Sequence, residues 1–343
     1  MGVRSLLSIQ RMTDFWSILR EIDPQTVERE AHQPIRVVIC GSPGIGKRTL
    51  AAALTAGETG LGSSAVEVCD LPDDVSVALP TADLYLYLIA ADRKPSATQR
   101  DHFRQLQRRQ SHVVGILNDV GGWGKAAVGR LRSDVARDLA LPLENVIDVN
   151  ALDRADINGR LVPEILRGVP QLALALGTNL PVFRDAAATR IILETSRVNA
   201  EFAAVSSLPS VIPIIGGLAS AGADMVVLTK NQVMLLLKLA LLHRRPIDNR
   251  LQVLTEILPV VGAGFVWRSL ARTLITLLPG LLAVGPRVGV AFVGTYVLGQ
   301  AGQYYYRWGQ RPPPELLERF RREALAHIET IAPILGQIGR RLT

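Results

Sequence analysis

One short stretch near the N-terminus constrains the fold more than any other part of the chain. Pro34 introduces IRVVIC, an apolar run with the length of a buried strand. A glycine-rich turn follows at residues 41–47, and residues 49–56 have the pattern of a helix. In α/β proteins, a strand that leads through glycines into a helix places backbone N–H groups around an anion. The stretch therefore predicts a phosphate-binding α/β domain, and an ordinary glycine-rich turn is the alternative.

Four further strand-like runs follow, at residues 65–69, 84–90, 113–117 and 146–149. Helical patterns separate them at residues 98–110 and 125–139. Strands that alternate with helices predict a parallel sheet with helices on both faces, as in P-loop NTPases. In such a sheet the first two strands are neighbours, so Cys40 and Cys69 are expected to lie close together.

Charge is distributed unevenly along the 343 residues, and this divides the chain in two. Residues 198–303 contain 12 charged residues among 106, whereas the other 237 residues contain 57. The apolar content of 48% excludes a disordered chain. Two cysteines and five scattered histidines argue against a disulfide framework or a zinc site. We therefore expect an ordinary charged α/β domain followed by a second, all-α hydrophobic domain.

The predicted organisation has five parts. A short amphipathic helix at residues 12–22 begins the chain, and it lacks the uninterrupted apolar core of a signal peptide, so the α/β domain is expected in the cytoplasm. The parts are an N-terminal helix and linker (1–33), the α/β domain (34–176), a connecting helix (177–201), the hydrophobic helical domain (202–306) and a C-terminal amphipathic helix (307–343).

The glycine-rich turn carries the candidate phosphate site. Its backbone would surround phosphate oxygens, and Lys47 would reach the terminal phosphates. In the standard loop, Ser or Thr follows the lysine and ligates Mg²⁺, but here Arg48 stands there and Thr49 comes one residue later. The candidate binding residues of the loop are Gly41, Ser42, Pro43, Gly44, Ile45, Gly46, Lys47, Arg48 and Thr49.

Residues 35–152 resemble the Era-like GTPases. Asp70 matches the first residue of that family's Asp-x-x-Gly motif, and Asp73 replaces the glycine. Asn118 matches the start of the guanine-reading Asn-Lys-x-Asp motif, with Asp119 as a substitute carboxylate, and Asn150-Ala151 stands at the base-contacting Ser-Ala signature. The resemblance implies GTP or another nucleotide and Mg²⁺ as cofactors. It also implies catalytic roles for Lys47 and Asp70, metal ligation by Thr49 and Asp70, and base contacts by Asn118, Asp119, Asn150 and Ala151.

The spacing of these motifs departs from the family. Lys47 and Asp70 are 23 positions apart, which leaves no room for a helix, a full first switch loop and another strand. The first switch is therefore expected to be truncated. With the metal ligands and the motif glycine also changed, we expect slow or absent hydrolysis and weakened selectivity for guanine.

A basic stripe runs through residues 93–137, which contain ten Lys and Arg but three acids. Arg100, Arg104 and Arg108 recur at every fourth residue, so they share one face of the predicted helix. Anionic lipid headgroups are the partner that this stripe fits best, and a solvated helix face is the alternative. We do not expect a nucleic-acid partner, because neither a recognition helix nor interleaved aromatic residues accompany the stripe.

The hydrophobic half contains apolar segments at residues 202–223, 224–242, 251–267, 273–286 and 288–306. Those of 19 to 22 residues match the about 20 needed to cross a bilayer. Ala291, Thr295 and Gly299 form a small-residue stripe that would let helices pack closely. Arginines flank the block at positions 190, 197, 244, 245, 250, 307 and 311, which favours crossings in pairs. A re-entrant hairpin and a buried soluble bundle, which would serve as an oligomer core, are the alternatives.

Residues 198–309, and LTKNQVMLLLKLA most clearly, resemble the C-terminal hydrophobic domain of YcjF-type bacterial membrane proteins. This resemblance implies membrane association and no particular substrate. The two halves together predict a nucleotide-binding, GTPase-like scaffold or switch at the cytoplasmic face of the cell membrane, with weak or lost hydrolysis. The alternatives are an active NTPase that remodels membrane and a soluble helical homo-oligomer with a pseudo-GTPase domain.

Overall fold

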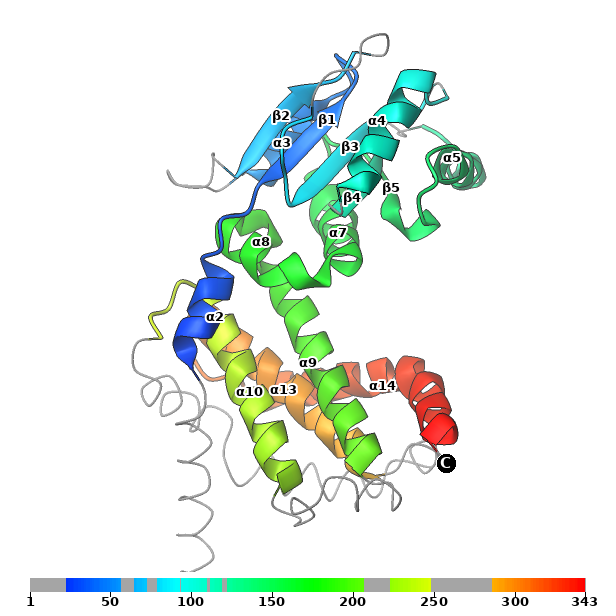
Figure 1. Cartoon of the computed structure of the whole chain (residues 1–343). Helices are drawn as coiled ribbons and strands as arrows, with labels where there is room; N and C mark the ends of the chain where they lie inside the picture. The colour runs from blue at the N-terminus through cyan, green and yellow to red at the C-terminus, as the bar shows by residue number, and fades with distance from the viewer. Residues whose placement is uncertain are drawn as a thin grey trace, which may run out of the picture. The chain divides into compact units, whose positions relative to one another are not determined.

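The chain forms two compact units. The computed structural model describes residues 23–56, 65–72, 79–92, 94–109, 112–118, 122–206, 223–247 and 286–342. One unit is His32–Arg190, and the other combines Met1–Ala31 with Ile191–Thr343. Figure 1 shows a sheet with helices in the first unit and helices alone in the second. The predicted helix at 12–22, the apolar segments at 251–267 and 273–285, and most of 202–223 lie outside the described residues.

A five-stranded parallel sheet forms the centre of the first unit. Its strands are β1 (Val37–Gly41), β2 (Val66–Asp70), β3 (Leu84–Ala90), β4 (His112–Asn118) and β5 (Val146–Val149). Their order is β2-β1-β3-β4-β5, and every neighbouring pair is parallel. The parallel α/β sheet predicted from the alternating pattern is thus confirmed. Cys40 pairs with Cys69 in the β1–β2 register, as expected.

The helices of this unit cover the sheet and leave the central strands buried. They include α3 (Lys47–Leu54), α4 (Ala97–Arg108), α5 (Lys125–Asp138), α7 (Val162–Gly168) and α8 (Ala173–Asn179), with the short turn α6 (Arg154–Asp156) before α7. Every residue of β1 is buried, whereas β2 at the sheet edge is only partly buried. Ser96 and Gln99 form a capping box that begins α4. A continuous apolar run therefore marks the centre of the sheet, because both faces of a parallel strand are covered.

Five helices make up the second unit as described: α2 (Pro24–Ala31), α9 (Arg184–Ser206), α10 (Ala223–Leu242), α13 (Pro286–Trp308) and α14 (Pro314–Leu342). The first residues of α9 belong to the α/β unit. α10 packs against α2 and α13, and α13 packs against α14. Lys238 on α10 forms an ion pair with Glu30 on α2 at 2.8 Å. Helix α2 was not expected, because its sequence is mostly polar.

The small-residue stripe on α13 lies in the interior of this bundle. Ala291 and Thr295 are buried. A Cβ atom added at Gly299 would lie 2.8 Å from a side-chain carbon of Ile192 and 3.1 Å from one of Leu235. α13 therefore approaches α9 and α10 closely at this point, as small residues at four-residue spacing allow, while the expectation that such packing occurs in lipid stays a prediction.

None of the helices in the described part of the chain combines the length and the apolar content that a membrane crossing needs. The apolar segments at 224–242 and 288–306 correspond to helices α10 and α13. The expectation that these two segments could cross a membrane is therefore not met.

Candidate functional site

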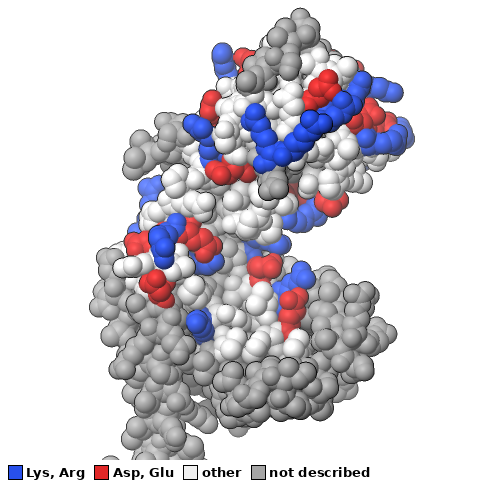
Figure 2. Space-filling view, viewed as in Figure 1, with Lys and Arg blue, Asp and Glu red and all other residues white. Residues whose placement is uncertain are grey.

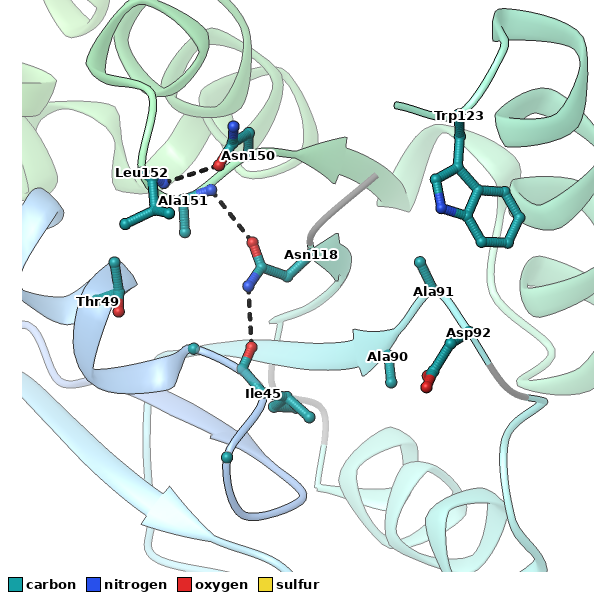
Figure 3. Close-up of a pocket in the computed structure, with 12 residues that line it drawn as sticks. Ile45, Thr49, Ala90, Ala91, Asp92, Asn118, Trp123, Asn150, Ala151 and Leu152 are labelled. Atoms are coloured by element: carbon teal, nitrogen blue, oxygen red, sulfur yellow. Dashed lines mark hydrogen bonds between the residues drawn. The ribbon is translucent and has the colours of Figure 1, made fainter. Parts of the chain in front are cut away.

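A cavity of about 490 Å³ opens where β1, β3, β4 and β5 end. Ligands of open α/β sheets bind at this edge, because the loops that follow the strands converge there. Figure 3 shows the lining residues and the turn after β1 facing the cavity together with the end of β4. The lining residues are Gly44, Ile45, Gly46, Thr49, Ala90, Ala91, Asp92, Asn118, Trp123, Asn150, Ala151 and Leu152.

Glycine is required at the last residue of β1 and at one position of the turn that follows it. Gly41 has φ +142°, and a Cβ atom there would lie 2.5 Å from the backbone oxygen of Leu88. Gly46 has φ +93°, and a Cβ atom there would lie 2.5 Å from Nδ2 of Asn118. L-residues with side chains rarely adopt these φ values, and the neighbouring atoms leave no space for a Cβ. The sequence pattern of the turn thus has a specific steric cause.

Asn118, the last residue of β4, holds two sides of the cavity together. Its Nδ2 donates to the carbonyl of Ile45 at 2.9 Å, and its Oδ1 accepts from the backbone N–H of Ala151 at 3.2 Å (Figure 3). The side-chain oxygen of Asn150 accepts from the N–H of Leu152 at 3.0 Å. Asn118 therefore fixes the glycine-rich turn to the loop after β5, which is a positioning role.

The predicted site residues divide into two groups in the structure. Those expected to contact a base lie together: Asn118, Asn150 and Ala151 share the cavity with Gly44, Ile45, Gly46 and Thr49. The two residues expected to be catalytic, Lys47 and Asp70, are not among the described residues that line this cavity. Asp119 and Asp73 lie outside the described residues.

Lys47 is engaged by the protein itself. Its side chain is 3% exposed, and its Nζ lies 2.6 Å from Oδ1 of Asp70. The same nitrogen donates to the carbonyl of Ser42. The hydrogen bond from Lys47 and its positive charge hold the pKa of the Asp70 carboxyl below its usual value, and Arg48 adds to this effect. Lys47, which the sequence predicts to contact phosphate, is thus already paired with the carboxylate of Asp70.

Ser42 connects the turn to helix α4. Its hydroxyl accepts a hydrogen bond from Nε2 of Gln99 at 2.9 Å, and both side chains are buried. Gln99 also closes the capping box with Ser96, since its Oε1 accepts from the Ser96 N–H at 2.8 Å. Sequence reasoning missed this link, although the Ser-x-x-Gln spacing before a helix could have indicated the capping box.

The cavity contains two further residues that sequence reasoning missed. Asp92 follows β3 by two positions, and Trp123 is 43% exposed at the cavity. Both are drawn in Figure 3, beside Ala90 and Ala91 at the end of β3. The position of Asp92 just after a buried strand was an available signal, because the ends of parallel strands meet at one edge.

Two cysteine thiols lie on the neighbouring strands β1 and β2, close to the glycine-rich turn in the sequence. Burial raises the pKa of the Cys40 thiol far above its ordinary value, and the neighbouring Cys69 adds to the effect. Burial also raises the pKa of the Cys69 thiol, together with the charges of Glu67 and Asp70. Because the thiolate is the reactive form, neither residue is suited to act as a nucleophile.

The residues present do not fit the Mg²⁺ ion that the GTPase resemblance implies. Mg²⁺ requires oxygen ligands in near-octahedral geometry. Arg48, which stands at the usual Ser/Thr ligand position, cannot ligate a cation, and the carboxylate of Asp70 is paired with Lys47. The cavity volume is within the usual range for small-molecule sites.

Helix α4 carries the basic face expected from the sequence, and Figure 2 shows Lys and Arg side chains gathered over it with acidic side chains beside them. Arg104 pairs with Asp101 at 2.5 Å, and Arg100 donates to the carbonyl of Pro95 at 2.7 Å. The like charges of this face are therefore partly compensated within the helix and its first turn.

No family model matches the chain, and no curated protein matches it.

Proposed function

We propose that the α/β unit binds a nucleotide in the cavity at the carboxyl edge of its sheet and hydrolyses it slowly or not at all. The observation that carries this proposal is the gathering of Gly44–Gly46, Asn118 and Ala151 around one cavity. These residues come from three separate segments, and Asn118 at the end of β4 bonds the turn after β1 to the loop after β5. A turn of this kind suits phosphate groups, and the adjacent cavity has room for a sugar and a base.

Weak or lost hydrolysis is supported by the state of the two residues expected to be catalytic. Phosphoryl transfer depends on electrostatic stabilisation of the transferred group, which Mg²⁺ and the loop lysine supply in working enzymes. Here the donor set does not fit Mg²⁺, and Lys47 is paired with Asp70. An active NTPase that remodels membrane is therefore the weaker candidate. Phosphate release above buffer that disappears in Lys47→Ala would restore it.

Action as a scaffold or switch at the cytoplasmic face of the cell membrane belongs to the same proposal. Its support is the low charge of residues 198–303 and the arginines of α4, which suit anionic lipid. A soluble helical homo-oligomer is the second candidate, and one observation favours it: α9, α10 and α13 bond polar side chains in their own interior. Fractionation with and without alkaline carbonate separates the two, since recovery in the soluble fraction without detergent would support the oligomer.

The nucleotide proposal is tested by equilibrium dialysis of the full chain with labelled GTP, GDP, ATP and ADP. We expect binding of at least one nucleotide, and a loss of about tenfold or more in affinity in Lys47→Ala, because a charge-assisted contact is removed. Thr49→Trp should also weaken binding, since it fills the cavity without touching Lys47. Lys125→Ala is the control, because Lys125 begins α5 and is not among the residues lining the cavity.

The melting temperature of each variant shows whether the protein still folds. A nucleotide that binds the native state raises the melting temperature of the parent chain. If none of the four nucleotides binds or shifts the melting temperature, the proposal is wrong.

A further inference from the structure

The ion pair between Lys47 and Asp70 bears on which nucleotide the turn accepts. The lysine of a phosphate-binding loop reaches the β- and γ-phosphates of its ligand. Lys47 Nζ lies 2.6 Å from Oδ1 of Asp70, so any phosphate oxygen that contacts this nitrogen also comes close to the carboxylate. A phosphate and a carboxylate that share one ammonium group compete for its single positive charge, and their mutual repulsion weakens the contact of each.

In GTPases Mg²⁺ is the cation that neutralises this crowding. In this chain the donors do not fit that ion. Arg48 is exposed at the second position of α3, and Asp70 responds to its charge. A guanidinium is always charged and binds phosphate oxygens in a bidentate manner. At the start of α3, two positively charged side chains, Lys47 and Arg48, therefore lie near one carboxylate, that of Asp70.

We propose that this site takes a nucleoside diphosphate without Mg²⁺, and that Asp70 disfavours the additional phosphate of a triphosphate. The inference rests on the nucleotide-binding function proposed above. A diphosphate brings one phosphate group fewer to Lys47, so it gains the contacts of the turn with less repulsion from Asp70. Arg48 is then a binding residue that supplies the positive charge for which other enzymes use a metal.

The experiment is calorimetric titration of the full chain with GDP, GTP, ADP and ATP, each in EDTA and in Mg²⁺. For the preferred base we expect the diphosphate to bind about tenfold more tightly than the triphosphate in EDTA, as an order of magnitude for one screened like-charge contact. Removal of Mg²⁺ should change the diphosphate affinity by less than about twofold, because no contact of the complex passes through the ion.

Two variants assign the effect to its residues. Asp70→Asn should bring the affinity for the triphosphate close to that for the diphosphate, while Asp101→Asn, a surface carboxylate on α4 that is also paired with an arginine, should not. Arg48→Ser should weaken diphosphate binding about tenfold in EDTA and make it depend on Mg²⁺, because serine restores the usual metal ligand. Arg108→Ser on α4 is its control.

The outcomes distinguish the two proposals. A triphosphate that binds more tightly than the diphosphate in Mg²⁺, or diphosphate binding that is lost in EDTA, overturns this inference and leaves nucleotide binding intact. Absence of binding by all four nucleotides in both buffers overturns nucleotide binding itself. If Asp70→Asn does not fold, the comparison of diphosphate and triphosphate on the unaltered chain still decides the question.

Discussion

The two units of this protein keep their buried polar side chains in different places. In the α/β unit, a prominent group of long-range polar contacts lies at the carboxyl edge of the sheet, where Asn118 bonds Ile45 and Ala151 and the buried Gln99 bonds Ser42. In the helical unit they lie inside the bundle. Asn199 on α9 donates to Thr295 on α13 at 2.8 Å and accepts from Asn231 on α10 at 2.7 Å.

This difference follows from how each unit satisfies its backbone. Parallel strands pair side by side and leave open loops at their ends, so polar side chains gather at those ends. Each helix satisfies its own backbone, so a polar side chain between helices has to find another side chain. Asn199 and Thr295 are both fully buried, and Gln232 on α10 also donates to Thr295 at 3.2 Å. A low density of charge therefore does not mean an apolar interior.

The largest expected effect concerns the rigid turn of the α/β unit. Gly41→Ala should lower the free energy of unfolding by about 3 kcal/mol, because the new Cβ would meet the backbone of Leu88 at 2.5 Å. Chemical denaturation with hydrogen exchange at β1 and β3 measures the loss and assigns it to this unit.

Two other glycines sharpen that comparison. Gly44→Ala, with φ +81° and open space, should cost about 1 kcal/mol. Gly299→Ala in the helical unit should cost about 1–2 kcal/mol, because the side chains of Ile192 and Leu235 can shift where a backbone cannot. If all three substitutions lowered the free energy of unfolding by the same amount, the backbone neighbour of Gly41 would not be what makes that position the least tolerant of a side chain.

The next effect concerns the interior of the helical unit. Asn199→Ala should lower the free energy of unfolding by about 2 kcal/mol, because it removes two hydrogen bonds and leaves buried partners unsatisfied. Ser196→Ala is the control: Ser196 is equally buried, but its hydroxyl bonds the carbonyl of Ile192 in its own helix. The control should cost less than about 1 kcal/mol. A control that costs as much as Asn199→Ala would show that burial matters here and the contact between helices does not.

The smallest effect concerns acid sensitivity, which each unit has at one exposed carboxylate. Lys47 lowers the pKa of Asp70, and Arg321 lowers the pKa of Glu318. For a lowered pKa, the ion pair contributes stability above the pKa of the unfolded chain and loses it as the pH falls through the lower, folded value. For Asp70 that loss lies below its ordinary value of 3.8.

Melting curves from about pH 6 down to about pH 2 measure this loss. We expect Asp70→Asn to flatten the acid-induced fall for the α/β unit and Glu318→Gln to flatten it for the helical unit. If either substitution changed the pH dependence of the other unit, the idea that each unit owes its acid sensitivity to an ion pair of its own would be wrong.

The sequence alone was enough to predict the five strands of the sheet. The strands at 84–90 and 146–149 have the predicted bounds, and the other three differ by one or two residues at each end. Apolar periodicity and the glycine spacing carry this information, because both depend on neighbours a few positions away. The helix α2 was missed because a polar segment gives no apolar period, although it packs on α10.

The tertiary structure decided what the site can do. Asn118 contacts a residue 73 positions before it and another 33 positions after it, and those contacts exist because β1, β4 and β5 end at the same edge. The pairing of Lys47 with Asp70 likewise follows from β1 and β2 being parallel neighbours. Local preferences cannot specify contacts across such separations, since they arise only when the strand order brings distant ends together. The sequence thus determined a glycine-rich turn between a strand and a helix, and the strand order determined that its lysine meets a carboxylate.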